Sequence, residues 1–234
     1  MVKRNGQPYS VFTPFRRAWK ALAAPVPADL LPTPAAIASA PNLPTLAIPS
    51  TRQAGHFMAG EGWAQDALRR FAQAQVFGYA AGRNRLDGDG TSGLSPYLRF
   101  GMLSARQAVL TAQQAIAAAP DDASRSSAEA WLNELIWREF YHAALYHFRG
   151  LLRQAFRPAA RHLTWADDVP AFDAWCQGST GYPVVDAALR QLAATGWMHN
   201  RARMIVASLL VKDLLIDWRR GTLHHWTRLP LPNC

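Results

Sequence analysis

The chain has 234 residues, of which 25 are Lys or Arg and 16 are Asp or Glu, so its formal net charge is +9 and its isoelectric point is near 10.2. A chain of this length can bury a sizeable core without covalent or metal cross-links. Its two cysteines, Cys176 and Cys234, lack the spacing of a zinc site or a disulfide framework. We therefore expect neither a structural metal nor a disulfide.

The charge of the chain and the length of its apolar runs also indicate where the protein is located and what kind of partner it binds. The longest uncharged apolar run, MIVASLLV, is too short to span a bilayer, and the basic N-terminus is not followed by the apolar stretch of a secretory signal. We therefore expect a cytoplasmic protein without a membrane anchor. The arginine-rich charge favours a nucleic-acid partner, because guanidinium groups pair with phosphates, although GC-rich coding raises arginine content as well.

Two N-terminal segments precede the main part of the chain. Residues 1–20 form a short aromatic and basic piece, QPYSVFTPFRRAW included, which we interpret as the end of a preceding domain or linker. Residues 21–55 are rich in proline, which disfavours helices and central strands. This second segment is therefore predicted to be an extended linker.

Helical patterns dominate after the linker. No useful length of chain alternates apolar and polar residues with a period of two, so an all-α fold is predicted. Apolar residues recur with helical spacing over residues 62–79, 104–119, 127–148, 182–195 and 197–220.

Several local signals mark where these helices begin and end. Ser95, followed by proline, and Ser104 are typical helix N-caps. Gly196 is a typical C-cap. Residues 82–90 and 120–127 are predicted to be loops.

The segment WLNELIWREFYH, residues 131–142, has neither a wholly apolar face nor a wholly polar face when it is drawn as a helix. At about 100° per residue, Trp131, Glu134, Trp137, Arg138 and Tyr141 share one arc, and leucine, isoleucine and phenylalanine occupy the other. This pattern fits a core helix with an i,i+4 ion pair between Glu134 and Arg138. It fits equally well the wall of a pocket.

Two further segments are candidates for ligand contact. Thr91, Ser92 and Ser95 precede or begin a helix, where hydroxyls and free N–H groups can hold a pyrophosphate, but an ordinary capped loop needs the same residues. In TGWMHNRARM, Asn200 and Arg203 share one helical face and Arg201 lies on another. One face could serve a buried ligand and the other a phosphate backbone, or the arginines could simply be solvated and Asn200 a cap.

Taken together, TSGLSPYLRFG, WLNELIWREFY, TGYPVVDAALRQLAATGWMHNRARM and VKDLLIDWRRG resemble, in this order, the flavin-binding domain of the DNA photolyase and cryptochrome family. The resemblance covers about residues 62–221 and is closest to class I cyclobutane pyrimidine dimer photolyases. It implies an all-helical domain that holds FAD. It further implies a monomer that binds UV-damaged DNA and repairs it by light-driven electron transfer.

The resemblance also implies residue roles. Glu134, Trp137 and Asn200 are the expected catalytic residues, with Trp137 stacking on a flipped dimer. Arg83, Glu134, Trp137 and Arg201 are expected to contact DNA, and Trp165 and Trp218 to carry electrons to the flavin. The expected FAD contacts are Tyr79, Thr91, Ser92, Gly93, Leu94, Ser95, Trp131, Glu134, Arg138, Trp197, Asn200 and Arg203.

Substrate choice and two departures complete the comparison with the family. The (6-4) branch resembles HHLARH where this chain has HNRARM, so Asn200 and Met204 favour cyclobutane dimers. The family's antenna-pigment domain is expected to be absent, and residues 222–234 are expected to match nothing after a domain spanning 56–221. A cryptochrome-like photoreceptor and an inactive helical fragment with residual DNA affinity therefore remain alternatives.

Overall fold

The computed structural model describes residues 1–32, 34–36, 38 and 57–228. Within these residues the fold is all-α, as predicted, and its one β-type pairing is an isolated bridge between Val2 and Pro8. No described helix is long and apolar enough to cross a membrane. Most of the proline-rich linker lies outside the described residues. The helices are α1 (Phe12–Lys20), α2 (Glu61–Arg70), α3 (Val76–Gly82), α4 (Ser95–Arg99), α5 (Ala105–Ala117), α6 (Asp122–His147), α7 (Val169–Gln177), α8 (Pro183–Thr195), α9 (Asn200–Ser208) and α10 (Trp218–Arg228).

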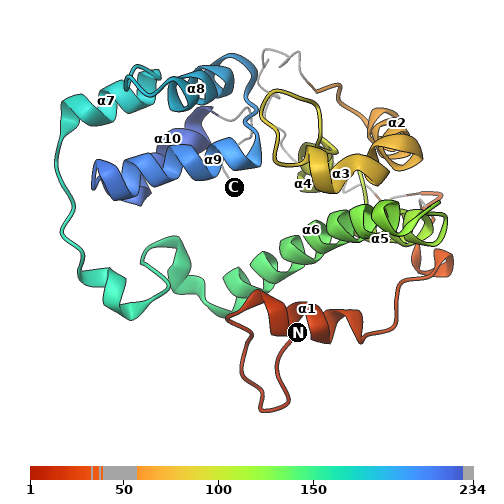
Figure 1. Ribbon diagram of the computed structural model, residues 1–234. Coiled ribbons are helices and arrows are strands. Elements are labelled where there is room, and N and C mark those ends of the chain that lie inside the picture. Colours follow the sequence, from red (N-terminus) through yellow and green to blue (C-terminus); the bar gives the residue numbers. More distant parts are fainter. Residues whose placement is uncertain (33, 37, 39–56, 229–234) are drawn as a thin grey trace.

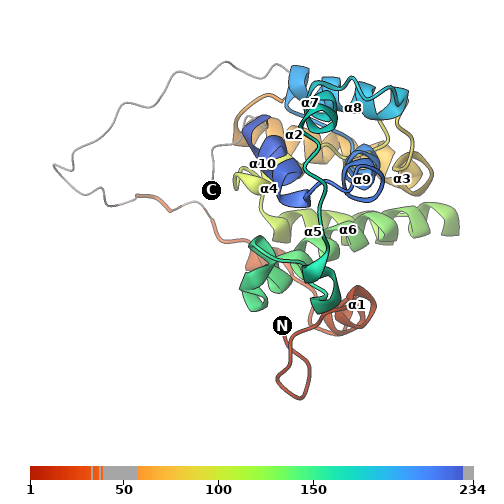
Figure 2. The ribbon, with the colours of Figure 1, turned by 90° about the vertical axis from the view of Figure 1, so that its left-hand side faces the viewer.

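The helices enclose two separate hydrophobic cores (Figure 1). Helices α1 to α6 build the first core around the long helix α6, whose Trp131, Leu135 and Ile136 are buried. Helices α7 to α10 build the second core around the fully buried Trp175. Figure 2 shows α7 to α9 above the axis of α6, and Figure 1 shows α8 and α9 beside α3 and α4, so the second core faces α6 and the helices α3 and α4 of the first.

Helix α6 begins earlier than the sequence predicts. Residues 122–126 were expected in a loop, but they form the first turns of α6. The Asp121 side chain accepts a hydrogen bond from the Ser124 N–H at 2.7 Å, which satisfies a free donor of the first turn. The prediction of a loop is wrong because Asp121 caps the helix.

The prediction of one helix over 197–220 is also wrong. Helix α9 continues as a π-helical stretch over Leu209–Asp213, and this helical segment ends before α10 begins. Leu215 has a φ of +52°, a left-handed conformation that no α-helix contains. Asp217 accepts a hydrogen bond from the Arg219 N–H at 2.9 Å, so it caps the new helix.

Other boundaries agree more closely. Gly196 ends α8 with a φ of +70°, which confirms it as the C-cap. Ser104 is the N-cap residue of α5, although its side chain accepts no capping hydrogen bond. The prediction of Ser95 as an N-cap is wrong, because Leu94 holds that position and Ser95 is the first residue of α4. The predicted helix over 62–79 is found from Glu61 to Gly82, with a π-helical stretch inside it. Helices α1 and α7 were not predicted.

Candidate functional site

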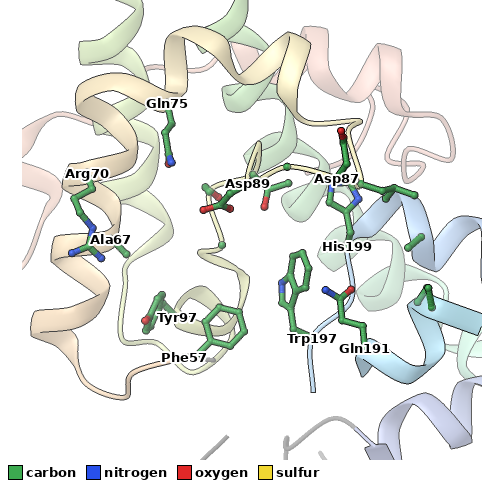
Figure 3. Close-up of a pocket in the computed structure, with 18 of the residues that line it drawn as sticks. Phe57, Ala67, Arg70, Gln75, Asp87, Asp89, Tyr97, Gln191, Trp197 and His199 are labelled. Carbon is green, nitrogen blue, oxygen red and sulfur yellow. The ribbon is translucent and has the colours of Figure 1, made fainter. Parts of the chain in front are cut away.

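A cavity of about 1000 Å³ lies between the two cores (Figure 3). Helix α2 and the loop over residues 86–93 form one wall, and α8 together with the start of α9 forms the other. Thr91, Ser92 and Gly93 line the first wall, and Trp197 lines the second. The cavity is therefore built from two segments that lie about a hundred residues apart in the chain.

The loop that lines the cavity is held by backbone packing. A Cβ atom on Gly90 would collide with the backbone of Gly82 at the end of α3, so only glycine permits this approach. Gly93 has a φ of +62°, which also favours glycine. The Ser92 hydroxyl accepts a long hydrogen bond of 3.5 Å from the Leu94 N–H. The loop thus presents hydroxyls and backbone to the cavity and buries Leu94 in the first core.

His199 is a second polar feature of the cavity. It is 5% exposed, and its Nδ1 accepts a hydrogen bond from the Arg201 N–H at 3.0 Å, so the ring caps α9. The Nε2 atom therefore carries the proton in the neutral ring, and among the described residues this buried atom has no hydrogen-bond partner. Burial, with the charge of Arg201, lowers the pKa of His199 below its usual value, and a weaker contact with the Arg83 backbone acts in the opposite direction.

Helix α6 connects to α3 through an ion pair. Arg83 donates to Glu134 Oε1 at 2.7 Å, and its guanidinium lies 5.5 Å from the ring centroid of Tyr79. Burial, followed by the negative charge of Glu134, raises the pKa of Tyr79 to about 12. The interpretation that Glu134 pairs with Arg138 is wrong. Glu134 pairs with Arg83, whereas Arg138 pairs with Glu139 at 3.2 Å.

The two tryptophans of α6 occupy different environments. Trp131 is 2% exposed and meets Phe71 edge to face at 4.9 Å, inside the first core. Trp137 is partly exposed and stacks on Phe12 of α1, with the Tyr141 ring 5.4 Å away. Neither indole lines the large cavity.

The start of α9 brings the two cores into contact. Arg201 donates to the Asn84 Oδ1 at 2.6 Å, across 117 residues of sequence. Arg203 donates from Nε to the Met198 carbonyl at 3.1 Å, and burial lowers its pKa. Asn200 is the first residue of α9 and is exposed.

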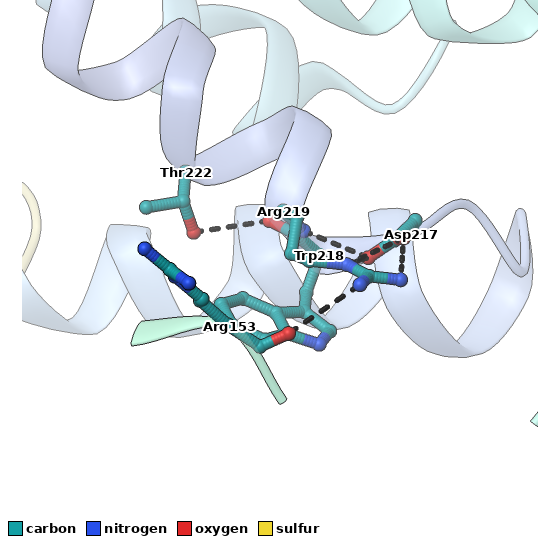
Figure 4. Close-up of polar contacts among 5 residues, drawn as sticks. All are labelled: Arg153, Asp217, Trp218, Arg219 and Thr222. Carbon is teal, nitrogen blue, oxygen red and sulfur yellow. Dashed lines mark hydrogen bonds and ion pairs between the residues drawn. The ribbon is translucent and has the colours of Figure 1, made fainter. Parts of the chain in front are cut away.

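Trp165 and Trp218 lie on two segments that are held together by a backbone hydrogen bond. The Ala166 N–H donates to the Leu215 carbonyl at 2.8 Å, which places the residue after Trp165 beside the turn before α10. Trp218 begins α10, and its carbonyl accepts from the Thr222 hydroxyl at 3.0 Å (Figure 4). Both indoles are partly exposed.

Comparisons with known proteins identify a family that this chain resembles. Residues 131–230 match the FAD binding domain of DNA photolyase. The Deoxyribodipyrimidine photo-lyase of Synechococcus sp. is 43% identical, over 94% of this chain and 48% of that protein, and the one from Escherichia coli is 41% identical, over 96% and 48%. A bacterial class III photolyase from Agrobacterium tumefaciens superposes with a TM-score of 0.80 at 33% identity, over 96% of this chain and 48% of that chain.

The chain is therefore similar to the DNA photolyases over nearly its whole length. It spans about half the length of the curated photolyases that it matches. The family match extends to residue 230, nine residues past the domain boundary expected at Gly221, and α10 likewise continues to Arg228.

The photolyase resemblance named twelve flavin contacts, and the cavity is lined by four of them, Thr91, Ser92, Gly93 and Trp197. Tyr79, Leu94 and Trp131 are buried in the first core. Glu134 and Arg138 form ion pairs, and Ser95 and Asn200 are exposed. Arg203 hydrogen-bonds the backbone beside the cavity.

Sequence reasoning missed other residues that line the cavity. His199, Gln191 and Tyr97 lie on its walls, and Asp87 and Asp89 lie on the loop (Figure 3). His199 carried no signal as a cap, because the predicted helix began at residue 197 and placed this histidine inside it. Tyr97 and Gln191 carried none, because only the packing of the two cores brings them to the same space.

Proposed function

We propose that this chain binds FAD in the cavity between its cores and takes part in light-driven repair of cyclobutane pyrimidine dimers in DNA. The main observation in support of this proposal is the cavity of about 1000 Å³, with hydroxyls and glycine backbone on one wall and Trp197 on the other. Its volume is at the upper end of the usual range for ligand sites. The match to the photolyase FAD-binding domain supports FAD as the ligand.

The residues present fit such a group. The Thr91 and Ser92 hydroxyls suit a pyrophosphate, and the Nε2–H of His199, which makes no hydrogen bond within ordinary distance of a described residue and only a weak contact with the Arg83 backbone, offers a donor to a ligand oxygen or nitrogen. When bound and reduced, FAD supplies the light-excited electron that splits the dimer. Trp165 and Trp218 are proposed to carry electrons toward it, from segments joined at Ala166 and Leu215.

The protein's part in lesion recognition is proposed for Trp137, Glu134 and Asn200. Trp137 offers a flat indole for stacking and Glu134 a carboxylate oxygen that accepts a hydrogen bond. The photolyases include enzymes that extrude the target base from the duplex. Arg83 already neutralises Glu134, so Arg83 orients the carboxylate. Arg201 bonds a neutral amide, so its charge is available to a DNA phosphate.

The packing of Trp137 favours a second candidate, a flavin photoreceptor without repair. Phe12 covers one side of its indole, and Tyr141 lies nearby in a nearly parallel plane. A cryptochrome from Synechocystis sp. superposes with a TM-score of 0.65 at 33% identity, over 73% of this chain and 35% of that one. The cyclobutane substrate, a monomeric state and a cytoplasmic location belong to the first proposal.

The visible spectrum of the purified chain, after incubation with FAD and gel filtration, tests the cofactor. A stoichiometric flavin band supports the proposal, and its absence would leave a helical fragment without a cofactor. Illumination of the reduced protein with UV-irradiated oligo(dT) then separates repair from photoreception. Trp137→Ala should weaken binding of the irradiated oligonucleotide while the flavin band persists, and the exposed Tyr146→Ala is the matched control.

A further inference from the structure

A second hollow, of about 590 Å³, lies at the other end of α6 from the Asp121 cap. Its walls are the N-terminal residues 3–10 and the segment 148–161 that follows α6. Lys3, Arg157 and Arg161 line it, and no carboxylate occurs among its described lining residues. It shares no residue with the cavity between the cores.

Both walls of this hollow are ordered by their own contacts. The N-terminal wall is a tight turn in which the Lys3 N–H donates to the Gln7 carbonyl at 2.8 Å. On the other wall, Phe148 and Phe156 meet edge to face at 5.2 Å, and Arg161 donates from Nε to the Ala155 carbonyl at 3.1 Å.

A third contact fixes the second wall from outside. Arg219 of α10 donates to the Arg153 carbonyl at 3.4 Å and is itself held by Asp217 (Figure 4). The segment 148–161 is thereby tied to the second core. The hollow therefore has a shape before any ligand arrives, which lowers the entropy cost of binding.

The charge of the hollow is not balanced from within the described residues. None of its three cations forms an ion pair there. Asp217, which is linked to the second wall through Arg219, already pairs with Arg219. Like charges gathered in one concave surface repel one another, and a bound anion relieves that repulsion.

We propose that this hollow binds a phosphate group of a nucleotide. Arg157 and Arg161 offer guanidinium forks that match phosphate oxygens, and Lys3 adds a point charge. Phe156 is 44% exposed and presents an aromatic surface beside the cations, which suits the attached base. The phosphate can belong to a polynucleotide or to a free nucleotide, and the two sources share this chemistry.

The test uses the full chain without added flavin. Calorimetry with 5′-AMP and with inorganic phosphate measures the free-nucleotide source, and fluorescence anisotropy with an undamaged fluorescein-labelled oligo(dT) measures the polynucleotide source. Arg157→Glu is expected to weaken binding of whichever probe is recognised by about tenfold, and removal of this contact should lower the slope of log K against log salt by about one. Arg157 is the preferred site because its side chain makes no hydrogen bond to another described residue, and because its exposed position makes the variant tolerable.

Arg125→Glu is the charge-matched control, because Arg125 is exposed at the opposite end of α6. It should change affinity less than about twofold if binding is local, because surface charges farther apart than a Debye length are screened. Phenylglyoxal labelling with mass spectrometry gives a readout for each residue, in which the bound probe should protect Arg157 and Arg161 and leave Arg125 reactive.

Protection by the oligonucleotide alone identifies a polynucleotide phosphate, and protection by 5′-AMP identifies a free nucleotide; both support the proposal. Equal losses in Arg157→Glu and Arg125→Glu would overturn it, as would a lack of binding by every probe. Because no flavin is needed, failure of this site leaves the flavin band unchanged. Failure of the flavin proposal likewise leaves phosphate binding measurable.

Discussion

Phe12 lies face to face with Trp137, with ring centroids 3.6 Å apart and planes inclined by 7°. Arg16 lies over the Phe12 ring at 5.9 Å, and Tyr141 follows Trp137 at 5.4 Å. These aromatic rings join α1 to α6. Residues 1–20, which the sequence suggests are the end of a preceding domain or linker, therefore support the Trp137 indole proposed for lesion binding. The surface that Trp137 can offer a ligand is therefore set partly by α1.

This stack predicts energetic coupling between Phe12 and Trp137. In a double-mutant cycle with Phe12→Leu and Trp137→Leu, urea unfolding should give a coupling free energy of about 0.5–1.5 kcal/mol, the usual range for an aromatic pair. A parallel cycle that pairs Phe12→Leu with Tyr146→Leu should be additive, because Tyr146 is 71% exposed and its ring contacts that of His147 and not that of Phe12. Additivity in the first cycle would contradict the stacked geometry.

Tyr79 predicts a loss of stability at high pH. Its folded pKa, about 12, lies above the usual value of 10.0, so the unfolded chain releases the proton first. The contribution is complete below pH 10 and is lost as the pH rises toward 12, by roughly 2–3 kcal/mol. Tyr79→Phe should remove this component of the pH profile, whereas Tyr141→Phe, at an exposed site, should leave it.

The ion pair between Arg83 and Glu134 also affects the pKa of Tyr79. Glu134 raises its pKa and Arg83 lowers it. Glu134→Gln should therefore lower the pKa of Tyr79 in a spectrophotometric titration at 295 nm, and burial should keep it above 10. A rise would contradict the raising effect of the Glu134 carboxylate on the pKa of Tyr79.

His199 predicts a loss of stability on acidification. Burial lowers its folded pKa, so the unfolded chain takes up the proton first, and stability present above about pH 6.5 is lost as the pH falls. His199→Asn should flatten this part of the profile while an amide oxygen still caps α9, whereas His199→Ala should also cost about 1 kcal/mol at pH 8 through loss of the cap. The exposed His142→Asn serves as control.

A second pair of variants, His199→Gln and His199→Asn, tests His199 as a ligand contact. His199→Gln keeps a donor near the Nε2 position and loses the cap, and His199→Asn does the reverse. If Nε2 donates to FAD, dissociation constants from fluorescence titration should be larger for Asn than for Gln. The opposite order would assign His199 a capping role alone.

Asp186 predicts a large cost on truncation. It is 7% exposed and accepts from the Thr180 N–H and hydroxyl and from the Gly181 N–H, at 2.6 to 3.0 Å. Burial opposes ionisation, but these hydrogen bonds outweigh it and lower the pKa of Asp186. Asp186→Ala should lower the free energy of unfolding by roughly 2–4 kcal/mol, because the donors lose a charged partner. Asp173→Ala, at an exposed site on α7, should have little effect.

The all-α class and the positions of α5, α6 and α8 followed from the sequence because apolar spacing and caps are local properties. The break at Leu215 did not, because it depends on Ile216 being fully buried in the second core. For the site, Thr91 to Gly93 and Trp197 could be named from motifs. The pairing of Glu134 with Arg83 could not, since it depends on how α3 packs against α6.

The bond between Arg201 and Asn84 has a consequence for cooperativity. Among the described helices, none of α1 to α6 packs extensively against one of α7 to α10, so few contacts transmit unfolding from one core to the other. Without a cavity ligand, calorimetry should resolve two melting steps. A molecule that touches both walls would merge them, because each half would then unfold only by releasing it. In this molecule the contents of the cavity decide whether the chain behaves as one cooperative unit or two.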